Sequence, residues 1–220
     1  MRINRFIATG TGLSRRGADI AIADGRVLVD GAPPKNGQDI AGHEQVTLDG
    51  KPVRLGTSQT ILFNKPAGYI TSRTGQGGKT IYELLPPEFH KLKPVGRLDK
   101  YSSGVLLLTS DGQLAQQLTH PKYHKTKLYE ITLDHALQPL HRQMIADIGV
   151  QLADGPSRFT LERLQDGDDT RWRATMHEGR NRQIRRTFEA LGYQVRRLHR
   201  TQFGEYAVAG LKAGDYRLVH

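Results

Sequence analysis

The apolar residues of this chain come in short runs interrupted by glycine, proline and charged residues, and this pattern limits the folds open to it. The longest runs, such as 105–108, fall far short of the ~18 apolar residues that suggest a membrane span. The first ten residues hold no apolar signal core, and no internal repeat or heptad is present. We therefore expect a globular α+β protein of the cytoplasm, with no membrane contact.

The first fifty residues predict a small α/β domain. Ile3, Phe6 and Ile7 have the i, i+3, i+4 spacing of a helix with one buried face. Ser14 is a suitable N-cap for a second helix that runs to about residue 24 and ends at Gly25. Short strands are expected over 27–29 and 46–48. We place this domain at 1–52 and the linker at 51–58, a stretch with Pro and Gly and no periodicity.

The remaining chain, 60–220, predicts a strand-rich domain. Strands are expected from 61 and over 104–109, 128–133, 159–164, 171–176 and 195–199, with 159–164 and 171–176 paired across an acidic turn. Helices are expected over 113–119 and 137–150, and a third has Ile184, Phe188 and Leu191 on its buried side and ends at Gly192. Residues 71–94 are mostly loop. This order predicts a mixed, mainly antiparallel sheet with flanking helices.

Arginine is concentrated in two segments. Lys and Arg total 32 against 22 Asp and Glu, a net charge of +10. Residues 171–200 hold nine arginines against two glutamates, and residues 1–16 hold four arginines and no acid. A planar guanidinium grips phosphate bidentately or stacks on a base, so this pattern favours an RNA partner. A solvated charged surface is the alternative that a charge run alone leaves open.

Several kinds of chemistry are excluded or disfavoured. The chain has no cysteine, which excludes disulfides, thiolate catalysis and cysteine-bound zinc. The segment 74–80 resembles a P-loop, but Arg73 stands where that motif needs glycine, so we expect a flexible loop. Pro121 separates His120 from His124 and disfavours a helical metal site. We expect no metal and no cofactor.

Asp99 is the strongest candidate for a catalytic group. It lies between Arg97 and Lys100, directly before a buried strand. Neighbouring cations favour the charged carboxylate, which is the form that a nucleophile or a general base needs. From spacing alone, an ordinary ion pair in a loop is the competing interpretation.

Three blocks of this sequence resemble the signatures of the bacterial ribosomal RNA pseudouridine synthases. They are Asn-Lys-Pro-Ala-Gly at 64–68, Gly-Arg-Leu-Asp at 96–99, and Glu-Gly-Arg-Asn-Arg-Gln-Ile-Arg-Arg at 178–186. The branch with the small-subunit uridine enzyme looks most similar, and residues 2–50 resemble the S4 RNA-binding domain that precedes its catalytic domain. Tyr101 departs from the pattern, because the family often has Asp there.

This resemblance implies an isomerase that needs no cofactor. Pseudouridine formation cleaves the C1′–N1 bond of uridine, rotates the base and rejoins it through C5. By resemblance, Asp99 is the catalytic carboxylate, acting as nucleophile or as base at C2′, Arg185 pairs with it, and Tyr129 stacks on the uracil. The i, i+3, i+4 spacing of Arg182, Arg185 and Arg186 is expected to cluster their guanidinium groups on one helix. The residues expected to bind RNA are Arg2, Arg5, Arg15, Arg16, Lys65, Arg97, Arg180, Arg182 and Arg186.

The partner expected from these features is ribosomal RNA or a pre-ribosomal particle, bound by a monomer. The alternative function is a non-catalytic ribosome assembly factor, which would bind RNA without isomerising it. DNA binding ranks last, because no helix-turn-helix or zinc-finger spacing is present. The target uridine, and whether it lies in 16S, 23S or transfer RNA, stay open.

Overall fold

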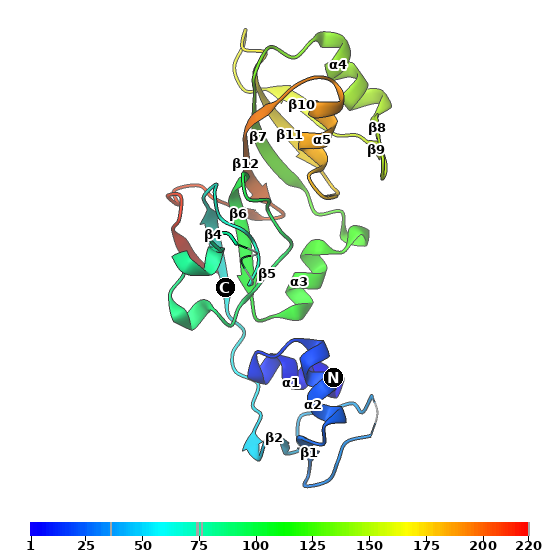
Figure 1. Ribbon diagram of the computed structural model, residues 1–220, viewed down its shortest axis with the longest axis vertical. Helices are drawn as coiled ribbons and strands as arrows, with labels where there is room; N and C mark the ends of the chain where they lie inside the picture. The colour runs from blue at the N-terminus through cyan, green and yellow to red at the C-terminus, as the bar shows by residue number, and fades with distance from the viewer. Residues whose placement is uncertain (36, 74, 76, 220) are drawn as a thin grey trace.

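The computed structural model describes residues 1–35, 37–73, 75 and 77–219. Thr74 and Gln76, which belong to the loop expected over 74–80, lie outside the described residues. Figure 1 shows a small N-terminal unit in blue at one end of the molecule, joined to a larger unit built on one long sheet. None of the helices in the described part is long and apolar enough to cross a membrane.

The N-terminal unit packs two helices on a three-stranded antiparallel sheet of order β1-β2-β3. Ile3, Phe6 and Ile7 are buried, and Ser14 Oγ accepts a hydrogen bond from the Gly17 N–H at 2.9 Å, so both expected helix signals are confirmed. The elements are α1 (Ile3–Thr11), α2 (Arg15–Ala23), β1 (Val27–Val29), β2 (Val46–Leu48) and β3 (Lys51–Pro52).

The expected start of the linker at residue 51 is wrong. Lys51 pairs with Leu48 in the β2–β3 ladder, and the buried Val53 belongs to the same apolar core as α1 and α2. The N-terminal unit therefore extends through residue 53. The error has a simple cause, because a two-residue edge strand is too short to show any periodicity.

The larger unit is built on a nine-stranded sheet of order β10-β11-β7-β12-β6-β4-β14, with β5 beside β6 and β13 beside β12. The β6–β12 pair is parallel and the other pairs in this sheet are antiparallel, which confirms the mixed, mainly antiparallel expectation. The strands are β4 (Thr60–Lys65), β5 (Lys93–Pro94), β6 (Ser103–Thr109), β7 (Lys127–Leu133), β10 (Thr160–Arg163), β11 (Arg171–Met176), β12 (Val195–Phe203), β13 (Tyr206–Ala207) and β14 (Tyr216–Val219).

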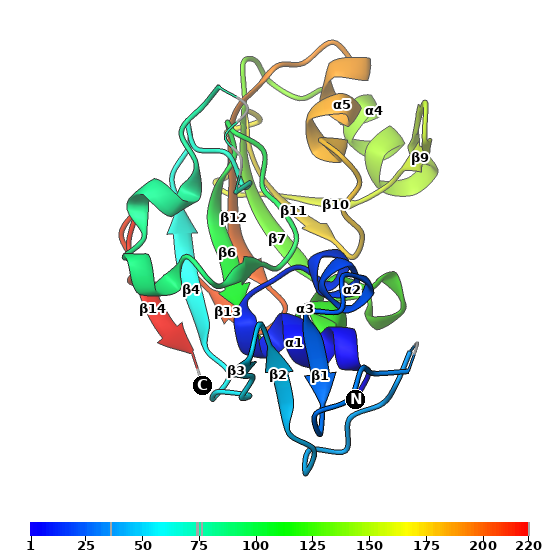
Figure 2. The same ribbon diagram turned by 60° about the horizontal axis from the view of Figure 1, so that its bottom comes forward.

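The helices of this unit lie at two places on the sheet. In Figures 1 and 2, α4 and α5 lie together near β10 and β11, whereas α3 lies toward the N-terminal unit. Phe188 on α5 and Trp172 on β11 are among the largest fully buried side chains and belong to one core. The helices are α3 (Gly112–Thr119), α4 (Pro139–Gln143), α5 (Gln183–Ala190), the 3₁₀ turns η1 (Ile81–Leu84), η2 (Pro87–Phe89) and η3 (Pro121–Tyr123), and the π-helical turn η4 (Met144–Ile148).

The helix expected over 137–150 is shorter than predicted. It begins at Pro139, changes to the π-helical turn η4 and stops at Gly149, whose φ of 90° and ψ of 139° cannot continue a helix. Residue 150 instead opens a hairpin, β8 (Val150–Leu152) and β9 (Gly155–Ser157), which the sequence patterns did not indicate. Asp154 lies in the turn between these two strands.

The parallel pairing of β6 with β12 brings distant parts of the chain together. Gly104 pairs with Arg200, and a Cβ at position 104 would lie 2.1 Å from the Arg200 carbonyl oxygen. Only glycine permits so close an approach, and its φ of +107° also favours glycine. The loop before β6, which holds Asp99, is thereby placed beside β12 and the start of α5.

Candidate active site

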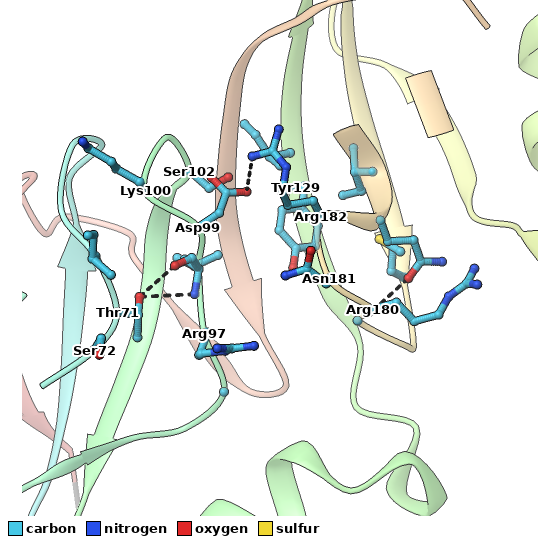
Figure 3. Close-up of a pocket in the computed structure, with 18 residues that line it drawn as sticks. Thr71, Ser72, Arg97, Asp99, Lys100, Ser102, Tyr129, Arg180, Asn181 and Arg182 are labelled. Carbon is cyan, nitrogen blue, oxygen red and sulfur yellow. Dashed lines mark hydrogen bonds and ion pairs between the residues drawn. The ribbon is translucent and has the colours of Figure 1, made fainter. Parts of the chain in front are cut away.

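A cavity of about 580 Å³ opens where these loops meet. Its volume falls within the range of small-molecule and cofactor sites in proteins. As Figure 3 shows, one wall comes from the loop before β6 and the other from β7 and the loop before α5. The lining residues are Ile70, Thr71, Ser72, Gly96, Arg97, Leu98, Asp99, Lys100, Ser102, Tyr129, Met176, Gly179, Arg180, Asn181, Arg182, Gln183, Ile184 and Leu198.

Asp99 projects into this cavity with its carboxylate fixed at both oxygens. Oδ1 accepts a hydrogen bond from the Tyr101 N–H at 3.0 Å. Oδ2 lies 3.4 Å from Arg185 Nε and 4.0 Å from Arg182 Nη1, and the Asp99 side chain is 21% exposed. Two guanidinium groups therefore stabilise the negative charge of a carboxylate that still reaches the cavity.

Arg185 connects three parts of the site. Its Nη1 donates to the Val195 carbonyl at 2.8 Å, and its Nη2 donates to the Tyr101 carbonyl at 3.0 Å and to Ser102 Oγ at 3.4 Å. The side chain is only 11% exposed. The expected pairing of Arg185 with Asp99 is thus present, and the same guanidinium ties the Asp99 loop to β12.

Lys65 has a different place from the one predicted. Its side chain is fully buried, and Nζ donates to the carbonyls of Pro66 at 3.0 Å, Asp99 at 3.1 Å and Ser102 at 2.7 Å. An ammonium group with three internal acceptors and no exposure cannot contact an RNA phosphate, so the RNA-binding prediction for Lys65 is wrong. The residue instead holds the backbone on either side of the Asp99 loop.

Burial lowers the pKa of Lys65 to about 8, with Asp99 opposing the shift and Arg200 adding to it. Above this value and below the ordinary 10.5, the unfolded chain keeps a proton that the folded chain has released, so stability rises with pH. This contribution to folding stability is complete above pH 10.5 and is lost as the pH falls through about 8.

We expect the unfolding free energy of the wild type, measured against Lys65→Met, to rise by up to about 1.4 kcal/mol per pH unit between these two pKa values. Urea denaturation of both proteins across that pH window checks this. The Met variant removes the titration of Lys65 and adds no titratable group. A constant difference between the two proteins would contradict the account.

Tyr129 faces Asp99 across the cavity, as Figure 3 shows. The ring is buried in β7, and its hydroxyl lies 3.5 Å from Arg200 Nη1. Arg200 itself is buried and donates from Nε and Nη2 to the Val105 carbonyl at 2.9 and 2.6 Å. Sequence reasoning did not single out Arg200. The alternation of β12 was an available signal, because it places Arg200 on the same face as Leu198, which lines the cavity.

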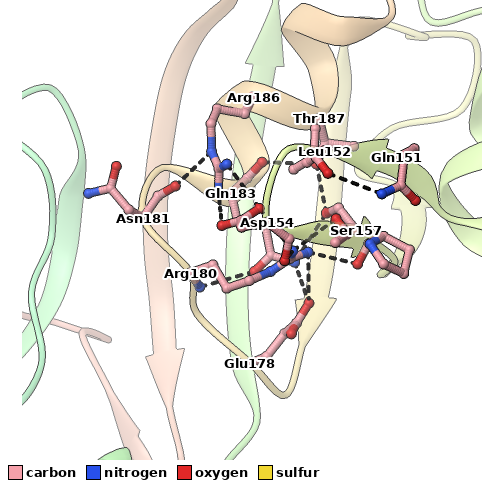
Figure 4. Close-up of polar contacts among 12 residues, drawn as sticks. Gln151, Leu152, Asp154, Ser157, Glu178, Arg180, Asn181, Gln183, Arg186 and Thr187 are labelled. Carbon is pink, nitrogen blue, oxygen red and sulfur yellow. Dashed lines mark hydrogen bonds and ion pairs between the residues drawn. The ribbon is translucent and has the colours of Figure 1, made fainter.

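Arg180 and Arg186 are bound to the β8–β9 hairpin, as Figure 4 shows. Arg186 makes a bidentate pair with Asp154, at 3.0 Å from Nη1 to Oδ1 and 2.7 Å from Nη2 to Oδ2. Arg180 Nη1 also donates to Asp154 Oδ1 at 3.0 Å and to the Gly155 carbonyl at 2.9 Å, and its Nη2 donates to the Pro156 carbonyl at 2.7 Å. These contacts join the loop before α5 to the hairpin, and Arg180 also lines the cavity.

The expected cluster of Arg182, Arg185 and Arg186 on one helix is wrong. Helix α5 begins at Gln183, and Arg182 precedes it with a left-handed φ of 46°. Because Arg182 lies outside the helix, the helical spacing does not apply to it. Arg182 and Arg185 converge on Asp99, whereas Arg186 turns to Asp154.

Three more arginines of the 171–200 segment lie on the opposite face of the sheet from Tyr129. Arg173 pairs directly with Glu130, the neighbour of Tyr129 in β7, and both Arg171 and Arg197 pair with Thr132. Successive residues of a strand point to opposite faces, so these arginines point away from the cavity. The segment is therefore not one continuous basic surface.

The other residues predicted to bind RNA lie in two places. Arg97 is exposed and lines the cavity. In the N-terminal unit, Arg15 and Arg16 are exposed and Arg5 is half-buried. Arg2 donates to the Gly37 carbonyl and lies 3.9 Å from Asp39. RNA binding by these residues stays a prediction.

The paired carboxylate and arginines give this cavity the chemistry of an enzyme active site. Residues 59–190 match the model of the RNA pseudouridylate synthase family, and the chain belongs to this family. The predictions of a pseudouridine synthase and of an isomerase are thereby confirmed, since pseudouridine and uridine contain the same atoms.

Individual relatives match almost the whole chain. It is 34% identical to the ribosomal small subunit pseudouridine synthase A of Yersinia pestis, over 99% of this chain and 94% of that protein. This chain is also 34% identical to the ribosomal large subunit pseudouridine synthase B of Bacillus subtilis, over 98% of this chain and 91% of that protein. By contrast, this chain spans only 44% of the length of the ribosomal large subunit pseudouridine synthase B of Xanthomonas campestris. A crystal structure of a pseudouridylate synthase matches with a TM-score of 0.71 and 32% identity, over 100% of this chain and 96% of that one.

Proposed function

We propose that this protein isomerises a specific uridine of ribosomal RNA to pseudouridine, with Asp99 as the catalytic carboxylate. The observation that carries the proposal is the position of Asp99 Oδ2 at the cavity, between Arg185 and Arg182. The relatives named for the small and for the large ribosomal subunit support ribosomal RNA as the substrate, and they are equally similar at 34% identity. The choice of subunit therefore falls to experiment.

The chemistry requires two bonds to break and two to form. The C1′–N1 bond breaks, the base turns, C1′ bonds to C5, and the hydrogen lost from C5 is balanced by the one gained at N1. Asp99 acts at the sugar, as nucleophile at C1′ or as base at C2′, and both roles need an unprotonated carboxylate. Arg185 and Arg182 stabilise that negative charge, and Tyr129 offers a flat ring to the uracil on the other side of the cavity.

The target uridine must leave its base stack to reach Asp99, at a cost of a few kcal/mol. Contacts elsewhere on the RNA offset this cost. We propose that the N-terminal unit, an S4-like domain by its resemblance, supplies such contacts through the exposed Arg15 and Arg16. We also propose that the enzyme acts as a monomer in the cytoplasm and that the isomerisation needs no metal or cofactor.

Carbodiimide labelling of ribosomal RNA tests this function. RNA treated with the wild type is expected to gain one labelled position, and RNA treated with Asp99→Asn none. Equal labelling by both proteins would exclude Asp99 as the catalyst. Tight binding of ribosomal RNA without any labelling by the wild type would favour the assembly factor instead.

Replacing Arg15 and Arg16 by glutamine is expected to weaken RNA binding and to reduce the slope of log affinity against log salt by about 1.4 to 1.8, since each phosphate contact contributes about 0.7 to 0.9. Binding titrations over a range of salt concentrations measure the slope. Arg26→Gln is the matched control, because Arg26 is exposed in the same unit but is paired with Asp49 at 2.5 Å. An unchanged slope for the double variant would exclude Arg15 and Arg16 from RNA binding.

A further inference from the structure

Tyr101 stands out as an aromatic side chain that the fold leaves in solvent. It is 63% exposed, the most of any phenylalanine, tyrosine or tryptophan side chain in the described part of the chain. Its neighbour Ser102 is 1% exposed, and Tyr129 across the cavity is 8% exposed. Burial of apolar area therefore does not explain an aromatic residue at this position.

The backbone of Tyr101 is held rigidly beside Asp99. Its N–H donates to Asp99 Oδ1 at 3.0 Å, and its carbonyl accepts from Arg185 Nη2 at 3.0 Å. Both bonds involve the groups that define the site. The point from which the ring projects is thus fixed relative to the carboxylate, although the ring itself touches solvent.

One cation lies over this ring, and two more are exposed in the lining of the cavity. Lys100 Nζ lies 5.7 Å from the ring centroid, within cation–π distance. Arg97 is exposed on the same loop, and the Arg182 side chain is 44% exposed on the opposite wall. An exposed aromatic ring among cations is the combination that binds single-stranded nucleic acid, because cations hold the phosphates while the ring stacks on a base.

We propose that Tyr101 stacks on an unpaired base next to the target uridine. The inference rests on the proposed function, since it takes the uridine to be the nucleotide at Asp99. When that uridine leaves its stack, each neighbouring base loses a stacking partner. The Tyr101 ring then takes the place of the uracil against one of these two bases. Stacking strength follows the size of the π-face, so this subsite favours a purine.

The test uses a short ribosomal RNA fragment centred on the uridine that the wild type labels, together with copies in which each flanking base is replaced by an abasic site. Tyr101→Ala is expected to weaken binding and raise KM about 5- to 100-fold, with kcat at saturation nearly unchanged. Tyr101→Phe keeps the ring and is expected to behave like the wild type.

Tyr123→Ala is the matched control. Tyr123 is 41% exposed and has Lys122 Nζ at 4.7 Å from its ring centroid, but its N–H donates to the His120 carbonyl at 3.1 Å instead of to Asp99. Its replacement is expected to leave KM unchanged. An effect as large as that of Tyr101→Ala would mean that any exposed lysine–tyrosine pair contributes, which would overturn the assignment.

The abasic fragments locate the stacked base. At one flanking position, base removal is expected to weaken binding to the wild type about as much as Tyr101→Ala does, and to add nothing in the variant. Full additivity at every flanking position would overturn the proposal. Dissociation constants measured in the Asp99→Asn background keep the two proposals apart, because no product forms there. Additivity with normal labelling by the wild type refutes only the role of Tyr101, whereas absence of labelling refutes the proposed function.

Discussion

Replacing Asp99 by asparagine is expected to lower the single-turnover rate of pseudouridine formation by at least about 1000-fold. Asparagine has nearly the same shape and can still accept the hydrogen bond that the Tyr101 N–H gives to Oδ1. It lacks the negative charge that either a nucleophile or a base requires. The loss therefore falls on the chemical step and leaves the loop in place.

RNA affinity separates this effect from misfolding. Asp99→Asn leaves Arg182 and Arg185 without their carboxylate, so the affinity for RNA is expected to stay the same or to increase. Asp154→Asn is the matched control, because Asp154 also pairs with two arginines but lies in the β8–β9 turn. Its rate is expected to fall less than about tenfold. A rate within tenfold of the wild type for Asp99→Asn would contradict the assignment.

The second large effect is expected at Arg185. Arg185→Met removes the cation 3.4 Å from Asp99 Oδ2 and the donors to the Tyr101 carbonyl and Ser102 Oγ. Loss of a preorganised charged group from an active site typically costs about 100- to 1000-fold in rate, and we expect a decrease of that size in kcat. Arg185→Lys keeps the charge but not the fork of donors, so it is expected to recover only part of the rate.

The measurement compares the single-turnover rates of Arg185→Met and Arg186→Met. The two residues are neighbours on α5, and both substitutions remove one positive charge. Arg186 pairs with Asp154 instead of Asp99, so its variant is expected to lose some stability and to keep most of its rate. Equal losses in the two variants would show that the charge of the helix matters and that the contact with Asp99 does not.

Local signals in the sequence predicted most of the secondary structure. The spacing of Ile3, Phe6 and Ile7 and the N-cap at Ser14 needed no tertiary information, because they depend on contacts within one or two turns. The hairpin of β10 and β11 was equally local, with its register running from Thr160 and Thr175 to Arg163 and Trp172. Asp99 was found in the same way, from the cations beside it in the chain.

The partners of the arginines could not be predicted, because they depend on long-range pairing. Arg180 and Arg186 meet Asp154 only because Gly149 ends a helix and opens the β8–β9 hairpin. Arg185 meets Asp99 only because β6 and β12 run parallel in one sheet. Counting charges along the chain showed how much positive charge each segment holds, but not which carboxylate each arginine pairs with in the folded protein.

Buried cations were the least visible feature. Lys65 and Arg200 have exposed fractions of 0% and 3%, although lysine and arginine are normally exposed residues. Each is accommodated by backbone carbonyls that the fold presents to it, at Asp99 and Ser102 for Lys65 and at Val105 for Arg200. Lys65 was predicted to bind RNA, whereas the structure gives it a supporting role at the Asp99 loop.

Mapping pseudouridines in ribosomal RNA from cells with and without this gene tests the central claim most directly. The account predicts that one position loses pseudouridine when the gene is deleted, and that the wild-type gene restores it whereas the gene carrying Asp99→Asn does not. An unchanged pattern of ribosomal RNA pseudouridines after deletion, or full restoration by Asp99→Asn, would contradict it.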